Sequence, residues 1–190
     1  MSELQKKIKS IPKSTFTLND IRKVTDMNDE SLRVSMNRLV KNGAVTRIVR
    51  GLYTSDPSSI DWERLAEELY SPSYLSCEYA LGRVGVLSQK PYALTLATTL
   101  RSKTVETPFA TIIYHHMNPQ LYWGYTQDQN ILIAEPEKAF LDLAYLSLRG
   151  YASFDPDEMN LALLNPARIN QYLKKFESTR LDRRIKVLFE

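Results

Sequence analysis

The polar side chains of the segment Asp29–Lys41 have the chemistry that contact with a nucleic acid requires. Arginine and asparagine can each make paired hydrogen bonds to purine edges, and arginine and lysine hold phosphates. A solvated helix face normally mixes both charge signs, whereas this segment offers basic and amide groups away from its apolar residues. The candidate DNA-binding residues are Arg33, Asn37, Arg38 and Lys41, together with Arg47 and Arg50 of the segment that follows.

The apolar spacing around these residues predicts a helix followed by a hairpin. Leu32, Met36, Leu39 and Val40 recur at helical intervals and therefore form one buried stripe. Asn28 or Asp29 is suited to cap the start of the helix, and Gly43 is suited to its end. Gly51 supplies the turn of a short basic hairpin that carries Arg47 and Arg50.

Two further short helices are predicted before this unit. Leu4, Ile8 and Ile11 form an amphipathic pattern that stops at Pro12. A second helix opens around Phe16, with Thr17 or Asn19 as its cap and with a buried face of Leu18, Ile21 and Val24. Three short helices and a basic hairpin within about 50 residues follow the order of a winged helix-turn-helix. The alternative is a small helical domain that uses the same shape to bind protein, and charge placement favours DNA.

Length and composition indicate a packed protein. The chain has 190 residues, of which 43% are hydrophobic and 25% are charged. No run approaches the roughly 18 apolar residues of a membrane span, and the N-terminus lacks the apolar core of a secretory signal. Cys77 is the only cysteine, which excludes an internal disulfide and a cysteine-based zinc site. We therefore expect a cytoplasmic protein that does not contact membranes.

The net charge of +3 conceals an asymmetry along the chain. Residues 1–55 contain 11 lysines and arginines against 5 acidic residues, a net charge of +6, so the remainder carries −3. A basic first module beside a mildly acidic body indicates that the first part meets nucleic acid.

Ser55–Ser59 is rich in turn-forming residues, so we predict one domain over 1–55 and a second over 60–190. The second domain is predicted as a small mixed sheet with helices, which makes the fold class α+β. The predicted strands are 74–76 (or a helix entry), 93–98, 104–107, 109–116, 122–125 and 130–134. The predicted helices are 61–69, 77–81 (broken by Gly82 and Gly85), 136–148 and a basic amphipathic one near 181–188.

Residues that could support catalysis or metal binding have simpler interpretations. His115 and His116 are adjacent on a predicted strand and point to opposite faces, so they cannot chelate one metal together. The cluster Glu135, Glu137 and Asp142 could serve acid–base chemistry, but acidic residues stabilise a helix start, and Asp142 can pair with Lys138 four residues earlier. We predict no catalytic residue, no cofactor and no metal, and hence no enzyme.

Three segments resemble the AbiEi family of antitoxins from type IV toxin–antitoxin systems, which are transcriptional regulators. They are SLRVSMNRLVKNGAVTRIVRGLYTSD, SYLSCEYALGRVGVLSQKP and ILIAEPEKAFLDLAYL, and the stretch between the last two is similar to the family's central sheet. The resemblance covers about Phe16 to Leu148, and the family often has glycine where this chain has Ala110. It implies a repressor of its own promoter that binds inverted repeats in double-stranded DNA and counters a toxin of nucleotidyltransferase type.

Several alternatives stay open at this point. The chain could be a protein-interaction adaptor, or a solitary, ligand-responsive regulator without a toxin. A monomer that binds each half-site cooperatively and a preformed dimer are both open, and the resemblance does not require the antitoxin to contact its toxin directly.

Overall fold

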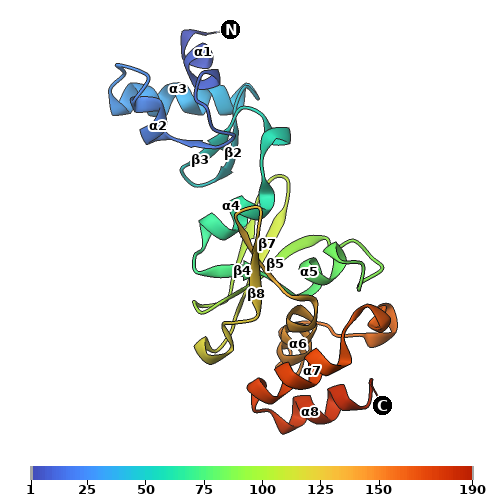
Figure 1. Ribbon diagram of the computed structural model, residues 1–190. Coiled ribbons are helices and arrows are strands. Elements are labelled where there is room, and N and C mark those ends of the chain that lie inside the picture. The colour runs from blue at the N-terminus through green and yellow to red at the C-terminus, as the bar shows by residue number, and fades with distance from the viewer. Residues whose placement is uncertain (1, 190) are drawn as a thin grey trace. The chain divides into compact units, whose positions relative to one another are not determined.

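The computed structural model describes residues 2–189 and has a mixed α+β architecture (Figure 1). The chain divides into two compact units, which are treated separately here. Unit 1 comprises Met1–Trp62 and Glu106–Phe109, and unit 2 comprises Glu63–Val105 and Ala110–Glu190.

Unit 1 contains three helices and a small antiparallel sheet. The helices are α1 (Glu3–Lys9), α2 (Leu18–Arg22) and α3 (Asp29–Lys41). The strands β1 (Phe16–Thr17), β2 (Thr46–Val49) and β3 (Leu52–Thr54) form a sheet in the order β1-β3-β2. A 3-10 turn, η1 (Pro57–Ser59), follows the sheet.

One hydrophobic core holds unit 1 together. The apolar stripe of α3 contributes Leu32, Met36 and Leu39, all buried, as the spacing predicted. They pack with the buried residues Ile8, Phe16, Ile21, Val45 and Tyr53 from the other elements. The core therefore fixes which side of α3 faces outward.

Unit 2 is built on a six-stranded mixed sheet. Its strands are β4 (Ser73–Leu75), β5 (Ala93–Thr98), β6 (Lys103–Glu106), β7 (Thr111–His116), β8 (Tyr125–Asp128) and β9 (Ile131–Ala134). The order is β6-β7-β5-β4-β9-β8. The pairs β5–β7 and β4–β9 are parallel, and the pairs β4–β5 and β8–β9 are antiparallel. This is the mixed sheet that the sequence predicted.

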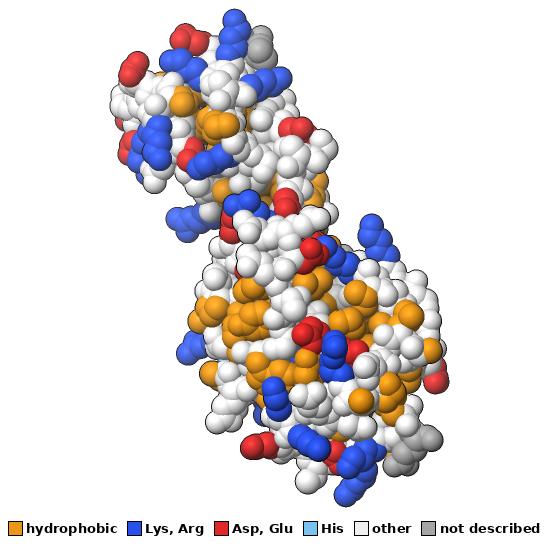
Figure 2. All heavy atoms as spheres, viewed as in Figure 1, with side chains coloured by type: hydrophobic (Ala, Val, Ile, Leu, Met, Phe, Trp, Pro, Cys, Tyr) orange, Lys and Arg blue, Asp and Glu red, His pale blue; other side chains and the backbone are white. Residues whose placement is uncertain are grey.

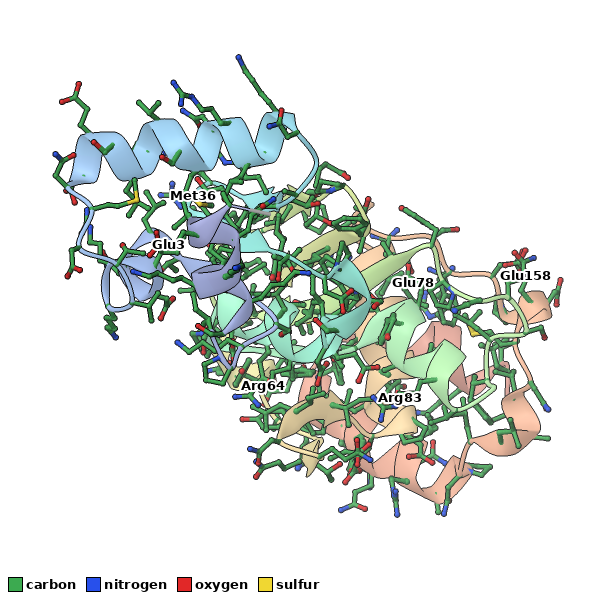
Figure 3. All side chains as sticks on the ribbon, turned by 90° about the horizontal axis from the view of Figure 1, so that it is seen from above. Glu3, Met36, Arg64, Glu78, Arg83 and Glu158 are labelled. Carbon is green, nitrogen blue, oxygen red and sulfur yellow. The ribbon has the colours of Figure 1, made fainter. Side chains whose placement is uncertain are left out.

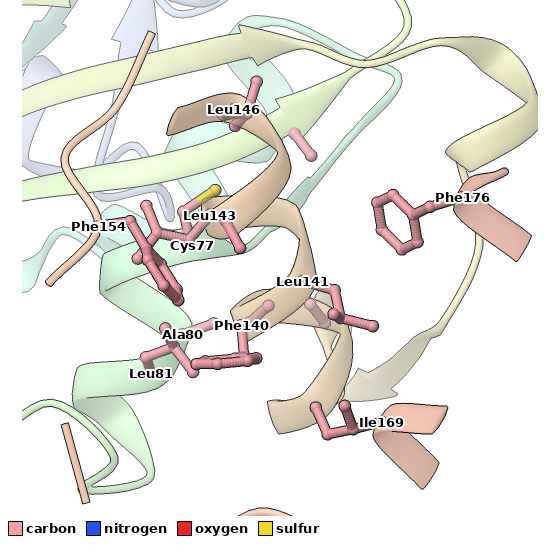
Figure 4. Close-up of a cluster of buried hydrophobic side chains, with 14 of the residues drawn as sticks. Cys77, Ala80, Leu81, Phe140, Leu141, Leu143, Leu146, Phe154, Ile169 and Phe176 are labelled. Atoms are coloured by element: carbon pink, nitrogen blue, oxygen red, sulfur yellow. The ribbon is translucent and has the colours of Figure 1, made fainter. Parts of the chain in front are cut away.

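Helices supply the rest of unit 2. They are α4 (Trp62–Leu69), α5 (Cys77–Arg83), α6 (Pro136–Ser147), α7 (Pro166–Leu173) and α8 (Thr179–Lys186). The short 3-10 segments are η2 (Pro119–Leu121), η3 (Pro156–Glu158), η4 (Leu161–Leu163) and η5 (Lys174–Phe176). Figure 4 shows Phe140 of α6 beside Ala80 and Leu81 of α5, and the buried Cys77 belongs to the same hydrophobic cluster.

Two expectations for unit 1 were wrong. Phe16 does not open the second helix but lies in β1, opposite Tyr53 of β3, and the helix begins after its cap Thr17. Val24 is 37% exposed and is not part of the buried face, because α2 already ends at Arg22.

Two expectations for unit 2 were also wrong. Gly82 does not break its helix, which runs to Arg83; a Cβ at Gly82 would lie 2.6 Å from Cδ of Pro91. The strand expected over 122–125 begins only at Tyr125, because Tyr122 caps the preceding 3-10 turn η2 and Gly124 has a positive φ of 74°. Among the residues that the structure describes, no helix is both long and apolar enough to cross a membrane.

Candidate nucleic-acid interface

The outer side of α3 presents the polar residues that the sequence singled out. Arg33, Asn37, Arg38 and Lys41 are all exposed, whereas Met36 points into the core (Figure 3). Arg33, Asn37 and Lys41 are spaced by four residues, so they line up along one ridge of the helix. Figure 3 shows long, nitrogen-tipped side chains rising from the side of α3 turned away from Met36.

Local hydrogen bonds define where α3 and its neighbour α2 begin. The side chain of Asn28 accepts a hydrogen bond of 2.9 Å from the backbone N–H of Ser31, which caps α3 as predicted. At α2, Thr17 and Asp20 form a reciprocal capping box, and Lys13 donates to Asp20 over 2.9 Å. These hydrogen bonds, with the ammonium of Lys13 first among them, hold the pKa of Asp20 well below its ordinary value.

The five candidate cations of unit 1 lack acidic partners. No carboxylate among residues 2–189 lies within ion-pair distance of Arg33, Arg38, Lys41, Arg47 or Arg50. The acidic side chains of the unit that do form ion pairs bind other bases: Glu3 binds Lys7, Asp20 binds Lys13 and Asp29 binds Arg22. Figure 2 shows lysine and arginine side chains spread over the visible face of this unit. The positive charge is thus free to meet an external anion.

The hairpin places two of these cations beyond the helix. β2 and β3 pair antiparallel, with Arg47 opposite Tyr53 and an irregularity between Arg47 and Val49. Arg50 and Gly51 form the turn, and Gly51 has the positive φ of 86° that such a turn requires. Arg47 and Arg50 are exposed, while Ile48 is buried between them and anchors the hairpin.

Two further features of α3 are its length and an exposed valine. A helix of 13 residues, the length of α3, spans about 20 Å. Val34 lies on the outer side of α3 and is 46% exposed. The DNA-binding residues predicted from the sequence did not include Val34. An exposed valine beside arginines nevertheless suits contact with a thymine methyl group.

Unit 2 contains a buried polar cluster at the predicted charged helix start. Lys138 and Asp142 of α6 form an ion pair with no exposed side-chain surface, which confirms the predicted pairing. The Asp142 carboxylate also accepts hydrogen bonds of 2.9 Å from the hydroxyls of Tyr74 and Ser76. Burial raises the pKa of Asp142, and the Lys138 ammonium opposes that shift. Because both charges are sealed from solvent, we interpret the pair as structural.

The other carboxylates of this cluster hold α7 in place. Glu137 accepts a hydrogen bond of 2.9 Å from the backbone N–H of Asn165, the cap of α7, and lies 3.5 Å from Arg168. Glu135 accepts a hydrogen bond from the hydroxyl of Tyr172. The expectation that these groups serve only the dipole of their own helix was therefore too simple, since they fasten a second helix to it.

The histidines lie apart, as their neighbouring strand positions predicted. The Nδ1 atom of His116 lies 2.8 Å from the backbone oxygen of Leu100 at the surface. His115 is half-buried, and this burial lowers its pKa. Among the described residues, no group of three or more His, Cys, Asp or Glu side chains is arranged to hold a metal ion.

Comparison with known proteins gives a structural likeness only. No protein-family model and no curated protein matches the sequence. A solved structure, that of the RV2827C protein from Mycobacterium tuberculosis, is similar with a TM-score of 0.59 and 13% sequence identity. The similarity covers 90% of this chain and 69% of that one. At this identity the likeness concerns the fold alone, an arrangement of helices and sheets of the α+β class.

Proposed function

We propose that the chain is a DNA-binding transcriptional repressor whose unit 1 acts as a winged helix-turn-helix. The observation that carries the proposal is the outer side of α3 and its hairpin, where five exposed cations and one amide have no acidic partner among the described residues. Nearly all non-specific affinity for DNA comes from neutralising phosphates, which needs such unpaired cations. The amide and arginines along one helix ridge add the chemistry for reading bases.

In this proposal the residues divide into two roles. Arg33, Asn37 and Arg38 face base edges in the major groove, while Lys41, Arg47 and Arg50 hold phosphates around it. The hairpin with Arg47 and Arg50 lies over the backbone or enters the minor groove. The operator is an inverted repeat in the promoter of the protein's own gene.

We further propose that this regulator is an AbiEi-like antitoxin. The support is the similarity of three segments to that family, including EPEKAFLDL, whose lysine and aspartate form the buried pair Lys138–Asp142. On this view the chain represses its own operon and counters a toxin of nucleotidyltransferase type. The alternative functions are a protein-interaction adaptor and a solitary regulator without a toxin.

Arginine substitutions test the proposed base-reading role. Replacing Arg33 or Arg38 by alanine should weaken binding to the upstream region by about 1–3 kcal/mol each and relax specificity at one position. Arg101→Ala is the matched control, because Arg101 is an exposed arginine of unit 2 without an ion-pair partner among the described residues. Affinities are measured by fluorescence anisotropy on the upstream duplex and on a scrambled duplex. If both α3 variants bind like the Arg101 variant, α3 is not the recognition helix.

A further inference from the structure

Unit 2 encloses a cavity of about 470 Å³ beside one face of its sheet. The parallel strands β5 and β7 pair with Thr95 opposite Ile113. Alternate residues of these strands, Thr95 on β5 and Ile113 and His115 on β7, line the cavity, as alternation along a strand requires. The volume lies within the range of small-molecule sites, about 300–1,000 Å³.

The wall formed by α5 contributes a carboxylate with one unsatisfied oxygen atom. Glu78 lines the cavity, and its Oε2 atom is buried without a hydrogen-bond partner among the described residues. A buried acceptor that lacks a donor costs free energy, so such groups are rare unless a ligand serves them. Burial raises the pKa of Glu78, as expected for a carboxylate that lacks a compensating charge.

The charges around the cavity favour a positively charged ligand. Asp155 and Glu158, from the segment after α6, line the same cavity as Glu78, and Lys90 is the lysine among its lining residues. His115 adds no positive charge near neutral pH, because burial lowers its pKa. A positive ligand would therefore meet three carboxylates and one ammonium.

Two exposed aromatic rings complete the lining. Tyr92 is 87% exposed and Tyr151 is 64% exposed, and both belong to the cavity. Exposed tyrosines beside a carboxylate suit an organic cation, because an aromatic face attracts positive charge. Leu87, Leu143 and Met159 give the interior apolar surface for the body of such a ligand.

We infer that this cavity binds a small organic cation, with its ammonium group on Glu78 and its apolar body between the sheet and the two tyrosines. The inference does not depend on the proposed DNA contact, since every residue that carries it lies in unit 2.

The test uses three probes of similar size that differ in charge: 2-phenylethylamine, 2-phenylethanol and phenylacetate. Calorimetry on the full chain measures their affinities, and proton NMR follows the ring signals of the two histidines, His115 and His116. We expect 2-phenylethylamine to bind one molecule per chain, at least tenfold more tightly than the alcohol and the acid, and to shift the signal of His115.

Variants locate the site. Glu78→Gln should lower the affinity for the amine at least tenfold, whereas Glu30→Gln, an exposed glutamate on α3, should leave it unchanged. Tyr92→Ala, at a position that is 87% exposed, should lower the affinity for the amine severalfold. This variant provides the test if Glu78→Gln does not fold.

The affinity for the amine should also fall as the pH is lowered from neutral towards about pH 4, the ordinary range of a glutamate, because the raised pKa of Glu78 lies above that range. Protonation of Glu78 removes the negative charge, and protonation of His115 adds a positive one. Asp155, Glu158 and Lys90 are the remaining charged groups of the lining. The proposal is overturned if the amine does not bind at concentrations on the order of 10 mM, if the alcohol binds equally well, if Glu78→Gln has no effect, or if His115 does not respond.

Discussion

At the scale of single residues, the pair Lys138–Asp142 shows how a buried charge is tolerated. The Lys138 Nζ atom donates to the hydroxyl of Tyr74 over 2.9 Å and lies 5.0 Å from the ring centre of Trp123. The carboxylate of Asp142 is satisfied by Lys138, Tyr74 and Ser76 together. Each charge depends on the other, because neither has access to solvent.

Replacing Lys138 by methionine should therefore lower the free energy of unfolding by about 3–5 kcal/mol, because Asp142 would stay buried without its counter-charge. The double variant Lys138→Met with Asp142→Leu should recover most of this loss, since it removes both charges. Urea denaturation of the two variants checks this. A single variant as stable as the wild type would mean that the pair is not sealed from water.

The capping box of α2 should make the stability of unit 1 depend on pH. The pKa of Asp20 is lower in the folded protein than its ordinary value of 3.8, so the ionised carboxylate stabilises the fold. This contribution is fully present above about pH 4 and is lost as the pH falls through the lowered folded-state pKa.

We expect Asp20→Asn to cost about 1 kcal/mol near neutral pH and progressively less in acid. Asp26→Asn, at an exposed aspartate without a partner among the described residues, is the control. Urea denaturation followed by the amide signals of unit 1 measures both. A cost for Asp20→Asn that stays constant down to about pH 2 would contradict the assignment.

At the scale of elements, the turn before β8 is shaped by the Lys138 side chain. Gly124 has a φ of +74°, and a Cβ added to it would lie 2.9 Å from Cγ of Lys138. Only glycine satisfies both the backbone conformation and the space at this position.

Gly124→Ala should consequently destabilise unit 2 by about 1–2 kcal/mol for the left-handed backbone and by about 1–3 kcal/mol more for the steric overlap. Gly150→Ala is a matched control in the same unit, because Gly150 has a similar φ of +75° but open space around its Cβ position. Thermal unfolding compares the two. Equal losses would show that the overlap with Lys138 is relieved at no cost.

The elements also separate what could be predicted from the sequence from what could not. The bounds of α3, its Asn28 cap and its buried stripe follow from local spacing, and the structure confirms them. β1 could not be predicted, because two residues acquire strand geometry only by pairing with β3, more than 30 positions away. Gly82 was misjudged because its helical position depends on close packing against Pro91.

The candidate DNA-binding residues and the cavity of unit 2 also differ in how far the sequence could predict them. The candidate DNA-binding residues lie on one helix and one hairpin, so local periodicity predicts which of them share a surface. The cavity of unit 2 combines Glu78 with His115, which come together through the parallel pairing of β5 and β7 and the packing of α5. The spacing of residues within one element cannot predict such contacts between separate elements.

At the scale of the whole molecule, the two units differ in charge. Unit 1 has 11 basic and 8 acidic residues, a net charge of +3, whereas unit 2 has 14 of each, a net charge of 0. Because a basic surface draws polyanions, we expect DNA to engage unit 1 rather than unit 2.

The salt dependence of DNA binding should report how many cations of the protein contact phosphates. Each phosphate contact contributes about −0.9 to the slope of log K against log salt concentration. We expect Lys41→Ala to make the slope shallower by about one unit on every duplex, while Arg101→Ala leaves it unchanged. A Lys41 variant with the wild-type slope would remove that residue from the phosphate contacts.

The most direct test of the central proposal is a gel shift of the full chain on its own upstream region and on a scrambled duplex, over a series of salt concentrations. We expect preferential binding to the upstream region, with a steep loss of affinity as the salt concentration rises. Equal binding to both duplexes, or no binding at low salt, would contradict the proposal of a repressor. Either result would indicate that the protein acts through protein partners instead.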